Sequence, residues 1–395
     1  MIQTIILPNM QTQIKEQFSP GIPVDEFGPQ YCIQVSDPAI GMKGYLVIDN
    51  TVLGPGKGGV RMTPTVTLGE VYRLARTMTW KNALVDIPFG GAKAGMVWNG
   101  GSDELKKKHV QAFARALKPF IPDLYITGPD VSSGEKEMQW IAETLGIWEA
   151  ATGKPSAYCE MTFEGKKKCG IPHEYGSTGF GVAHATRVIA ELLGMDLKKT
   201  KIAIEGFGNV GSFAFEFLKQ WDAQIVAVSD SRGTAVSEKG FDVELLLQLK
   251  REKRSVSEYS GAQVLPKDAI FGLDVDILIP ASVTDVINEY NKDSIRAKVI
   301  VEGANIPMRE NIENELMDRG ILIVPDFVAN SGGVISSYAE YRGSSPEEMF
   351  ELVEQKVVAA TRTVMSQSIE KKRNPREVAL EIAQTKVRQA MQEKI

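Results

Sequence analysis

The chain has 395 residues, of which 43% are hydrophobic and 24% charged, and its formal net charge at pH 7 is −5. This length predicts two domains rather than one compact core. The charge balance gives no reason to expect nucleic acid or a membrane surface as a partner, and no apolar run reaches the roughly 18 residues that span a bilayer.

The N-terminal 18 residues lack a basic stretch and a small-residue cleavage site, so we expect no secretory signal. The cysteines Cys32, Cys159 and Cys169 are odd in number and form no CxxC pair, which argues against a disulfide framework and a zinc site. The three histidines lack the spacing of metal ligands. We therefore expect a cytoplasmic protein with reduced thiols and no bound metal.

The first sixty residues contain short extended segments that end in the turn-rich sequence GPGKGGVRM. This pattern predicts a small sheet that delivers Lys57 and Arg61 to a loop. The next segment, 67–83, is predicted to be a helix, because Thr67 and Glu70 form a capping box and apolar residues follow at helical spacing. Lys81 falls at the edge of the apolar stripe of this helix, where an apolar residue would be expected.

The stretch WKNALVDIPFGGAKAGM, residues 80–96, places Lys81 and Lys93 among apolar and glycine residues. Burial and a second nearby ammonium both lower the pKa of a lysine, which leaves an amine that can act as a base. Gly90, Gly91 and Gly95 would let the backbone come close to a bound ligand. The alternative interpretation is a surface lysine on a turn that the glycines shape.

A second amphipathic helix is predicted for residues 103–117, with acidic residues in its first turn. Asp130 follows on a loop just before an expected capping box from Ser132 to Glu135, so the start of a helix would hold its carboxylate in place. Residues 151–175 show no clear period and are expected to connect two domains.

From Gly179 onward, helices and apolar strands alternate, which predicts a parallel sheet covered on both faces. The strands are expected at residues 201–205, 225–229, 276–279, 299–302 and 321–324. Each ends in small or polar residues, which suit the ligand-binding edge of an open α/β sheet.

The first of these strands runs into Gly206-Phe207-Gly208-Asn209-Val210-Gly211, which fits the dinucleotide pattern G-x-G-x-x-G. In this pattern, the first glycine makes the turn, the second admits the pyrophosphate and the third packs helix on strand, while the amides at the helix start hold the charge. Asp230, at the end of the next strand, should accept bonds from the adenine ribose, which favours NAD. Arg232 could instead pair with a 2′-phosphate, so NADP stays open.

The last section begins with ANSGGV, residues 329–334, and continues in two helices opened by Ser345-Pro346 and Asn374-Pro375. We expect these helices to pack back on the first domain. The predicted fold class is α/β. The first domain spans 1–175 with 345–395, and a Rossmann-type, doubly wound dinucleotide-binding domain spans 176–344.

These motifs together resemble the glutamate/leucine/phenylalanine/valine dehydrogenase superfamily, and within it most closely the glutamate dehydrogenases. The resemblance covers nearly the whole chain, through GPGKGGVRM, MTWKNALVDIPFGGAKAG, GPDVSSG, STGFGV, GFGNVG, EGAN and PDFVANSGGV.

The resemblance implies a role for each matching residue. Lys93 would be the catalytic lysine and Asp130 its partner in proton transfer. Lys81 would bind the substrate α-carboxylate, and Lys57 with Ser337 the side-chain carboxylate. Residues that orient the nicotinamide half of the cofactor are Thr178 and Asn305.

The resemblance also implies reversible, NAD- or NADP-dependent oxidative deamination of L-glutamate to 2-oxoglutarate and ammonia, in a homo-oligomer that is commonly a hexamer. The first domain, 1–175 with 345–395, would be the substrate-binding and oligomerisation domain. Converging lysines suit a dicarboxylate. A cleft between two domains would close to protect the imine from water. Two alternatives stay open: the same chemistry on a monocarboxylic amino acid such as leucine, phenylalanine or valine, and a catalytically silent regulator that binds nucleotide.

Overall fold

The structure, a computed structural model, describes residues 21–394 except 162–164 and 166. It divides into two compact units. Unit 1 comprises Met1–Pro172, Ser336–Met349 and Leu380–Ile395, and unit 2 comprises His173–Ile335 and Phe350–Ala379. The expectation that the N-terminus carries no secretory signal concerns residues outside the described part of the chain.

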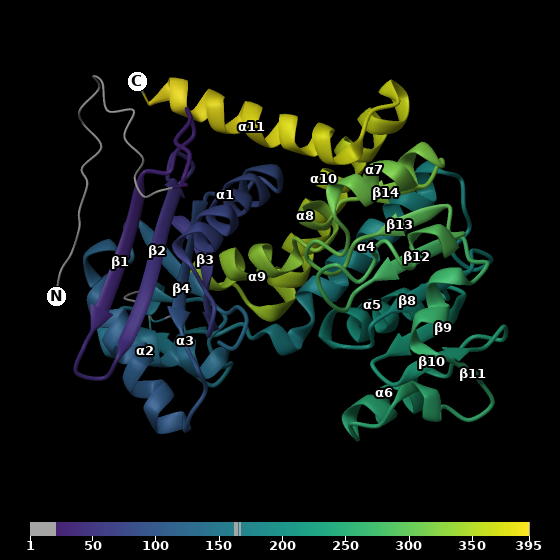
Figure 1. Ribbon diagram of the computed structural model, residues 1–395, viewed down its shortest axis with the longest axis horizontal. Helices are drawn as coiled ribbons and strands as arrows, with labels where there is room; N and C mark the ends of the chain where they lie inside the picture. The colour runs from purple at the N-terminus through teal and green to yellow at the C-terminus, as the bar shows by residue number, and fades with distance from the viewer. Residues whose placement is uncertain (1–20, 162–164, 166, 395) are drawn as a thin grey trace. The chain divides into compact units, whose positions relative to one another are not determined.

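Unit 1 is built on a five-stranded sheet with the order β1-β2-β4-β3-β5 (Figure 1). The strands are β1 (Tyr31–Asp37), β2 (Met42–Asn50), β3 (Gly56–Thr63), β4 (Gly90–Val97) and β5 (Tyr125–Gly128). β1, β2 and β4 pair antiparallel, whereas β3 runs parallel to both β4 and β5.

Helices cover both faces of this sheet. Successive side chains of β2 point to opposite faces and so belong to two different cores. Leu46 belongs to a core shared with Phe113 of α2 (Asp103–Leu117), on the face that also packs α3 (Glu135–Leu145). Val47 belongs to a second core with Val71 of α1 (Leu68–Leu84). The sheet of unit 1 is therefore sandwiched between α1 and the pair α2–α3.

Two helix starts in unit 1 differ in how well they were predicted. Thr67 caps α1 as expected and accepts a bond from the Glu70 amide at 3.2 Å. The capping box predicted from Ser132 to Glu135 is wrong, because α3 is capped at Gly134, whose amide donates to Glu137 at 2.7 Å. The sequence offers two overlapping S/G-x-x-E patterns there, and the backbone uses the second.

The segment predicted to be a loop around Lys57 and Arg61 is strand β3, so that prediction is wrong. Its glycines allow the strand to lie unusually close to its neighbours. A Cβ on Gly58 would come within 1.7 Å of the Ala92 carbonyl oxygen on β4, a spacing that only glycine tolerates. The glycine run that suggested a turn is instead needed for close strand packing.

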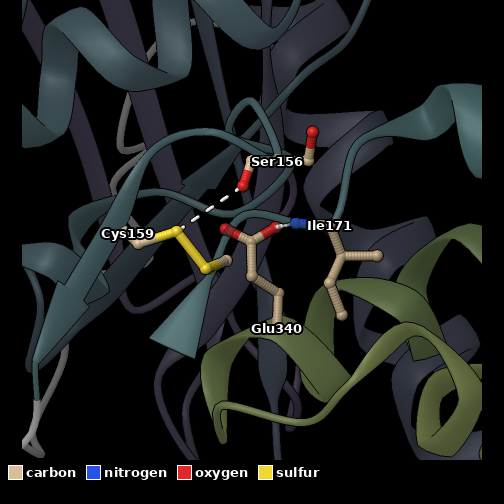
Figure 2. Close-up of a disulfide and its surroundings, with 5 residues drawn as sticks. Ser156, Cys159, Ile171 and Glu340 are labelled. Atoms are coloured by element: carbon tan, nitrogen blue, oxygen red, sulfur yellow. Dashed lines mark hydrogen bonds between the residues drawn. A yellow bond between two sulfur atoms is a disulfide. The ribbon is translucent and has the colours of Figure 1, made fainter. Parts of the chain in front are cut away.

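Residues 151–175, expected to be an irregular connection, contain the hairpin of β6 (Cys159–Met161) and β7 (Lys167–Cys169). Cys159 and Cys169 face each other across it and form a disulfide, with Cα atoms 4.1 Å apart (Figure 2). The prediction of reduced thiols is therefore wrong for this pair. The register of the hairpin places the two cysteines opposite each other, and their spacing in the sequence did not predict this pairing.

Unit 2 is built on a seven-stranded sheet with the order β11-β10-β9-β8-β12-β13-β14. The strands are β8 (Ile202–Glu205), β9 (Ile225–Asp230), β10 (Gly233–Val236), β11 (Gln263–Leu265), β12 (Ile277–Pro280), β13 (Val299–Val301) and β14 (Leu322–Val324). The five predicted strands pair parallel, whereas β10 and β11 were not predicted and run antiparallel at one edge. This sheet confirms the predicted fold class.

Helices of unit 2 pack on this sheet, and Ile312 and Leu316 of α7 share one hydrophobic core with Ala203, Leu278 and Ile300 of the sheet. The helices are α4 (Ser177–Leu192), α5 (Asn209–Gln220), α6 (Val243–Arg251), α7 (Glu310–Asp318) and α8 (Asp326–Ala329). In the described part of the chain, no helix is both long and apolar enough to cross a membrane.

Three further helices complete the chain: α9 (Gly332–Tyr341), α10 (Pro346–Lys371) and α11 (Pro375–Glu393). The predicted starts of the last two are confirmed. Ser345 accepts a bond from the Glu348 amide at 3.2 Å, and Asn374 accepts one from the Arg376 amide at 2.8 Å. Each of the three helices contributes residues to both units.

Candidate active site

Lys93 and Asp130, the predicted proton-transfer pair, are in contact in unit 1. Lys93 lies on β4 with 8% of its side chain exposed, and its Nζ is 3.0 Å from Asp130 Oδ2. Asp130 follows β5 in a tight turn, where its amide donates to Ser133 Oγ at 3.0 Å. A Cβ on Gly59 would lie 2.8 Å from Asp130 Cβ, so β3 passes directly against this residue.

Arg61, one of the residues the sequence placed near the site without a role, is the second cation on Asp130. Its Nε donates to Asp130 Oδ2 at 3.0 Å. Burial raises the pKa of Asp130, but the charges of Lys93 and Arg61 outweigh this effect, so the pKa lies below its ordinary value. The carboxylate is therefore kept ionised next to the catalytic lysine candidate.

Lys57 on β3 is buried, with 3% of its surface exposed. Its Nζ donates to the Thr127 carbonyl at 2.9 Å and lies where a Cβ on Gly128 would be only 2.4 Å away. Burial lowers the pKa of Lys57 to about 7; the carboxylate of Glu340 opposes this shift, and the charges of Lys93 and Lys154 add to it. Of the lysines predicted to bind the substrate, Lys57 and Lys93 therefore lie close enough for their charges to interact.

Lys81, the third predicted lysine, is in the last turn of α1 and half-buried. Ser337, also half-buried, lies on α9 three residues before Glu340. Both belong to unit 1, together with Lys57 and Lys93.

Glu340 and Lys154 form a buried ion pair that sequence reasoning missed. Lys154 Nζ is 2.6 Å from Glu340, and both side chains are almost fully buried. Glu340 also accepts a bond from the amide of Gly153 at 2.7 Å. A second bond to Glu340 comes from the amide of Ile171 at 2.9 Å (Figure 2). One carboxylate on α9 therefore holds both ends of the segment that contains the disulfide. The partners are 186 residues apart, and no local pattern marks them.

The glycines around Lys93 accommodate protein atoms rather than a ligand, so their predicted role is wrong. A Cβ on Gly90 would lie 1.9 Å from the Asn50 carbonyl oxygen, and one on Gly91 would lie 2.0 Å from Thr79 Oγ1 of α1. These positions let α1 and the neighbouring backbone approach β4. Tight packing on both sides is what buries the Lys93 side chain.

In unit 2, the G-x-G-x-x-G turn has the geometry that the motif requires. Gly206 has φ +89°, and a Cβ there would lie 2.7 Å from the Ser282 amide. A Cβ on Gly211 would lie 1.9 Å from the Gly206 carbonyl, whereas nothing is within 4 Å of one on Gly208. Because α5 starts at Asn209, the amides of Asn209 and Val210 lack acceptors within the helix. The turn thus combines an open approach with a positive helix end, which fits a pyrophosphate.

Asp230 ends β9, but its carboxylate is already engaged by its own chain. Oδ1 accepts from the Arg232 amide at 2.8 Å, the Gly233 amide at 3.2 Å and Ser255 Oγ at 3.0 Å. Oδ2 accepts from the Val256 amide at 2.9 Å. Ribose hydroxyls would have to share these oxygens, which weakens the argument for NAD over NADP.

Lys250, on the last turn of α6, is a residue near the glycine turn that the sequence did not suggest. Its Nζ donates to the carbonyl oxygens of Phe207 at 3.2 Å and Gly208. Burial lowers the pKa of this lysine. A helix-terminal lysine is usually a solvated capping charge, so no sequence signal distinguished it.

Thr178 and Asn305 meet the ANSGGV segment. Asn330 Nδ2 donates to Asn305 Oδ1 at 2.9 Å, which fixes the orientation of that amide. A Cβ on Gly333 would lie 3.0 Å from Thr178 Oγ1, so the start of α9 packs on the start of α4. The structure therefore brings both predicted nicotinamide residues of unit 2 next to the ANSGGV segment, and adds Asn330 to them.

A buried charge network supports the Asn305 loop. Arg376, at the start of α11, is 2.7 Å from Glu302, 2.6 Å from Glu313 and 2.9 Å from Asp326. Asp326 in turn accepts a bond from the Ile306 amide at 2.9 Å. In the part of the chain that the structure describes, no cluster of three or more His, Cys, Asp or Glu side chains has a geometry that could hold a metal ion.

The known proteins that this chain resembles point to one family. The chain matches the family model described as the Glu/Leu/Phe/Val dehydrogenase dimerisation domain over residues 29–146, and the model described as Glutamate/Leucine/Phenylalanine/Valine dehydrogenase over residues 169–394. It is 37% identical over 304 residues to the NADP-specific glutamate dehydrogenase of Saccharolobus shibatae, covering 74% of this chain and 69% of that protein.

Two further proteins extend the comparison. The NAD-specific glutamate dehydrogenase A of Halobacterium salinarum is 33% identical over 362 residues, covering 88% of this chain and 81% of that protein. The crystal structure of the hetero-hexameric glutamate dehydrogenase from Thermus thermophilus, in its Leu-bound form, aligns with a TM-score of 0.79 and 28% identity, covering 93% of this chain and 90% of that one. The chain therefore belongs to the glutamate/leucine/phenylalanine/valine dehydrogenase family.

Proposed function

We propose that the protein is an NAD(P)-dependent glutamate dehydrogenase that interconverts L-glutamate with 2-oxoglutarate and ammonia. The observation that carries the substrate assignment is Lys57. It is a buried lysine on the same unit as the Lys93–Asp130 pair, and Glu340, the carboxylate that raises its pKa, is already paired with Lys154. A second substrate carboxylate would favour the charged form of Lys57, which burial disfavours in its absence.

The residues of unit 1 have separate roles in binding the substrate and in proton transfer. Lys57 with Ser337 binds the side-chain carboxylate, and Lys81 binds the α-carboxylate. Asp130 takes a proton from the substrate amino group during oxidation. Lys93 Nζ is 3.0 Å from Asp130, so a proton can pass directly between the two groups. In its amine form, Lys93 removes a proton from the water that attacks the substrate iminium, and Asp130 returns its proton to the nitrogen of the resulting carbinolamine. Ammonia then leaves as Asp130 takes the proton of the carbinolamine hydroxyl, which forms 2-oxoglutarate.

The cofactor residues lie in unit 2. When bound, the nicotinamide supplies the hydride acceptor and donor for the substrate α-carbon. The turn at Gly206, Gly208 and Gly211 with the first amides of α5 holds the pyrophosphate, and Thr178 with Asn305 orients the nicotinamide. Asp230 and Arg232 leave both NAD and NADP acceptable, in line with relatives named as specific for either one. Substrate binding is accordingly assigned to unit 1 and nucleotide binding to unit 2.

The alternatives make different demands on the site. A dehydrogenase for leucine, phenylalanine or valine has no use for a buried ammonium at position 57. A silent regulator has no use for a lysine and an aspartate held 3.0 Å apart. Glutamate dehydrogenation uses both features.

We further propose a homo-hexamer in the cytoplasm. The hexameric Thermus relative and the family model named for a dimerisation domain support an oligomer. Intracellular proteins of hyperthermophiles contain disulfides, so the Cys159–Cys169 disulfide is compatible with a cytoplasmic enzyme.

The test compares wild type with Lys57→Leu in reductive amination of 2-oxoglutarate and of 2-oxoisocaproate, each with NADH and NADPH. We expect wild type to prefer 2-oxoglutarate. Lys57→Leu should lower kcat/KM for 2-oxoglutarate by about 10²-fold or more, because a charge-assisted hydrogen bond is lost, and leave 2-oxoisocaproate unchanged or improved.

The matched control is Lys136→Leu, which removes an exposed lysine of the same unit. Preference of the wild type for 2-oxoisocaproate, or an unchanged selectivity in Lys57→Leu, would show that the substrate is not a dicarboxylate. The same assays rank the two cofactors.

A further inference from the structure

Two cations from two strands meet at one oxygen of Asp130. Lys93 Nζ of β4 and Arg61 Nε of β3 each lie 3.0 Å from Oδ2. The carboxylate is thus held from two sides, by one lysine and one arginine.

Arg61 is itself held in place. Its Nη1 donates to Glu70 Oε1 at 2.7 Å, while its Nε donates to Asp130. Glu70 is in the first turn of α1, which Thr67 caps. The planar guanidinium therefore links the start of α1 to the Asp130 turn. Because the guanidinium is rigid, the direction of its bond to Glu70 fixes the direction of its bond to Asp130.

We propose that Arg61 is the positioning residue of Asp130: it anchors Oδ2 and so fixes the carboxylate for proton exchange with the substrate amino group, and it supplies a permanent positive charge when Lys93 gives up its proton. This inference rests on the proposed function, because it assigns Arg61 a role in the same proton transfer.

The charge argument explains why the residue is an arginine. Lys93 must alternate between ammonium and amine during turnover, and in its amine form it no longer stabilises the Asp130 carboxylate. A guanidinium does not lose its proton in proteins, so Arg61 keeps one cation on the carboxylate throughout. Without Arg61, burial would favour the protonated acid at that moment.

The groups that face Asp130 come from three strands. They are Arg61 on β3, Lys93 on β4 and Tyr125 on β5, and Glu70 of α1 lies behind Arg61. Burial and the nearby Asp130 carboxylate keep the pKa of Tyr125 well above its ordinary value, so it stays neutral. Arg61 and Lys93 are thus the charged groups whose removal would change the ionisation of Asp130.

The test uses the full-length enzyme with Arg61→Met, Arg61→Lys and the control Arg73→Met, which removes an exposed arginine of α1. Glutamate oxidation is followed against pH. We expect Arg61→Met to lower kcat by about 10- to 100-fold with little change in the KM for glutamate, and to move the acid limb of the kcat profile up by about one pH unit. In Arg61→Lys, part of the lost kcat should return and the acid limb should move most of the way back to its wild-type position. The lysine returns the positive charge but lacks the planar, two-donor geometry of the guanidinium.

The proposal would be overturned if Arg61→Met and Arg73→Met had the same kcat and the same acid limb. Arg61 would then have only a structural role, linking β3 to α1. Wild type that oxidises no amino acid would instead refute the proposed function. The Arg61–Asp130 pairing is then judged by melting temperatures of Arg61→Met, Asp130→Asn and the double variant. Shifts that add fully would show that the two side chains do not interact, whereas a double variant less destabilised than the sum supports the pairing.

Discussion

Lys57 shows how a binding residue can weaken the fold that carries it. Its side chain is buried, and its pKa falls from 10.5 in the unfolded chain to about 7 in the folded one. Between these two values the unfolded chain binds more protons than the folded chain, so the free energy of unfolding rises with pH across this window. Below pH 7 the full cost of the buried charge is present.

We therefore predict that Lys57→Met raises the free energy of unfolding at pH 6 by about 2–4 kcal/mol, and that the gain shrinks towards pH 10. Chemical denaturation of wild type and variant at pH 6, 8 and 10 measures it. Lys136→Met should show no comparable trend. A variant less stable than wild type at pH 6 would mean that Lys57 contributes favourable contacts that exceed its desolvation cost.

At the scale of elements, the hairpin β6–β7 combines a covalent link with a buried anchor. The disulfide joins Cys159 to Cys169 across ten positions, while Glu340 of α9 binds the amides of Gly153 and Ile171 at the two ends of the segment. The disulfide restricts the unfolded chain, whereas the anchor orders the folded one. The two effects are therefore separable.

We predict that Cys159→Ser/Cys169→Ser lowers the free energy of unfolding by about 2–3 kcal/mol, the loss expected for a loop of this length. Activity with 2-oxoglutarate should be retained, because the Glu340 contacts remain. Thermal melting with and without a reductant measures the effect, and Cys32→Ser is the control because Cys32 is a free thiol. A melting temperature insensitive to the double substitution would show that the disulfide does not form in solution.

At the scale of the whole molecule, the sheet of unit 1 has two edge strands, β1 and β5, within the described residues. Edge strands present unpaired backbone groups that another chain can cover. The segment 29–146, which contains this sheet, is the part that matches the dimerisation-domain model.

We predict that the purified protein elutes as one species of roughly 260 kDa, six copies of the 43.3 kDa chain. Size-exclusion chromatography with light scattering measures the mass at several concentrations. A species at the mass of one chain would contradict the proposed hexamer without affecting the assignment of the chemistry.

The features that could be predicted from the sequence depend on residues only a few positions apart. Thr67, Ser345 and Asn374 cap helices because a cap involves only the next two or three amides. The glycine turn at Gly206 and the strand before it were predicted for the same reason. The family followed from the order of several such motifs along the chain.

Tertiary structure alone decided the contacts that join distant residues. Arg61 reaches Asp130 across 69 positions, and Glu340 reaches the Lys154 amide across 186. The Cys159–Cys169 pair depends on a hairpin register, and strand β3 depends on the closeness of its neighbours. Such pairings follow from how strands align and helices cover a sheet, because charge and burial act between atoms that are close in space, whatever their separation along the chain.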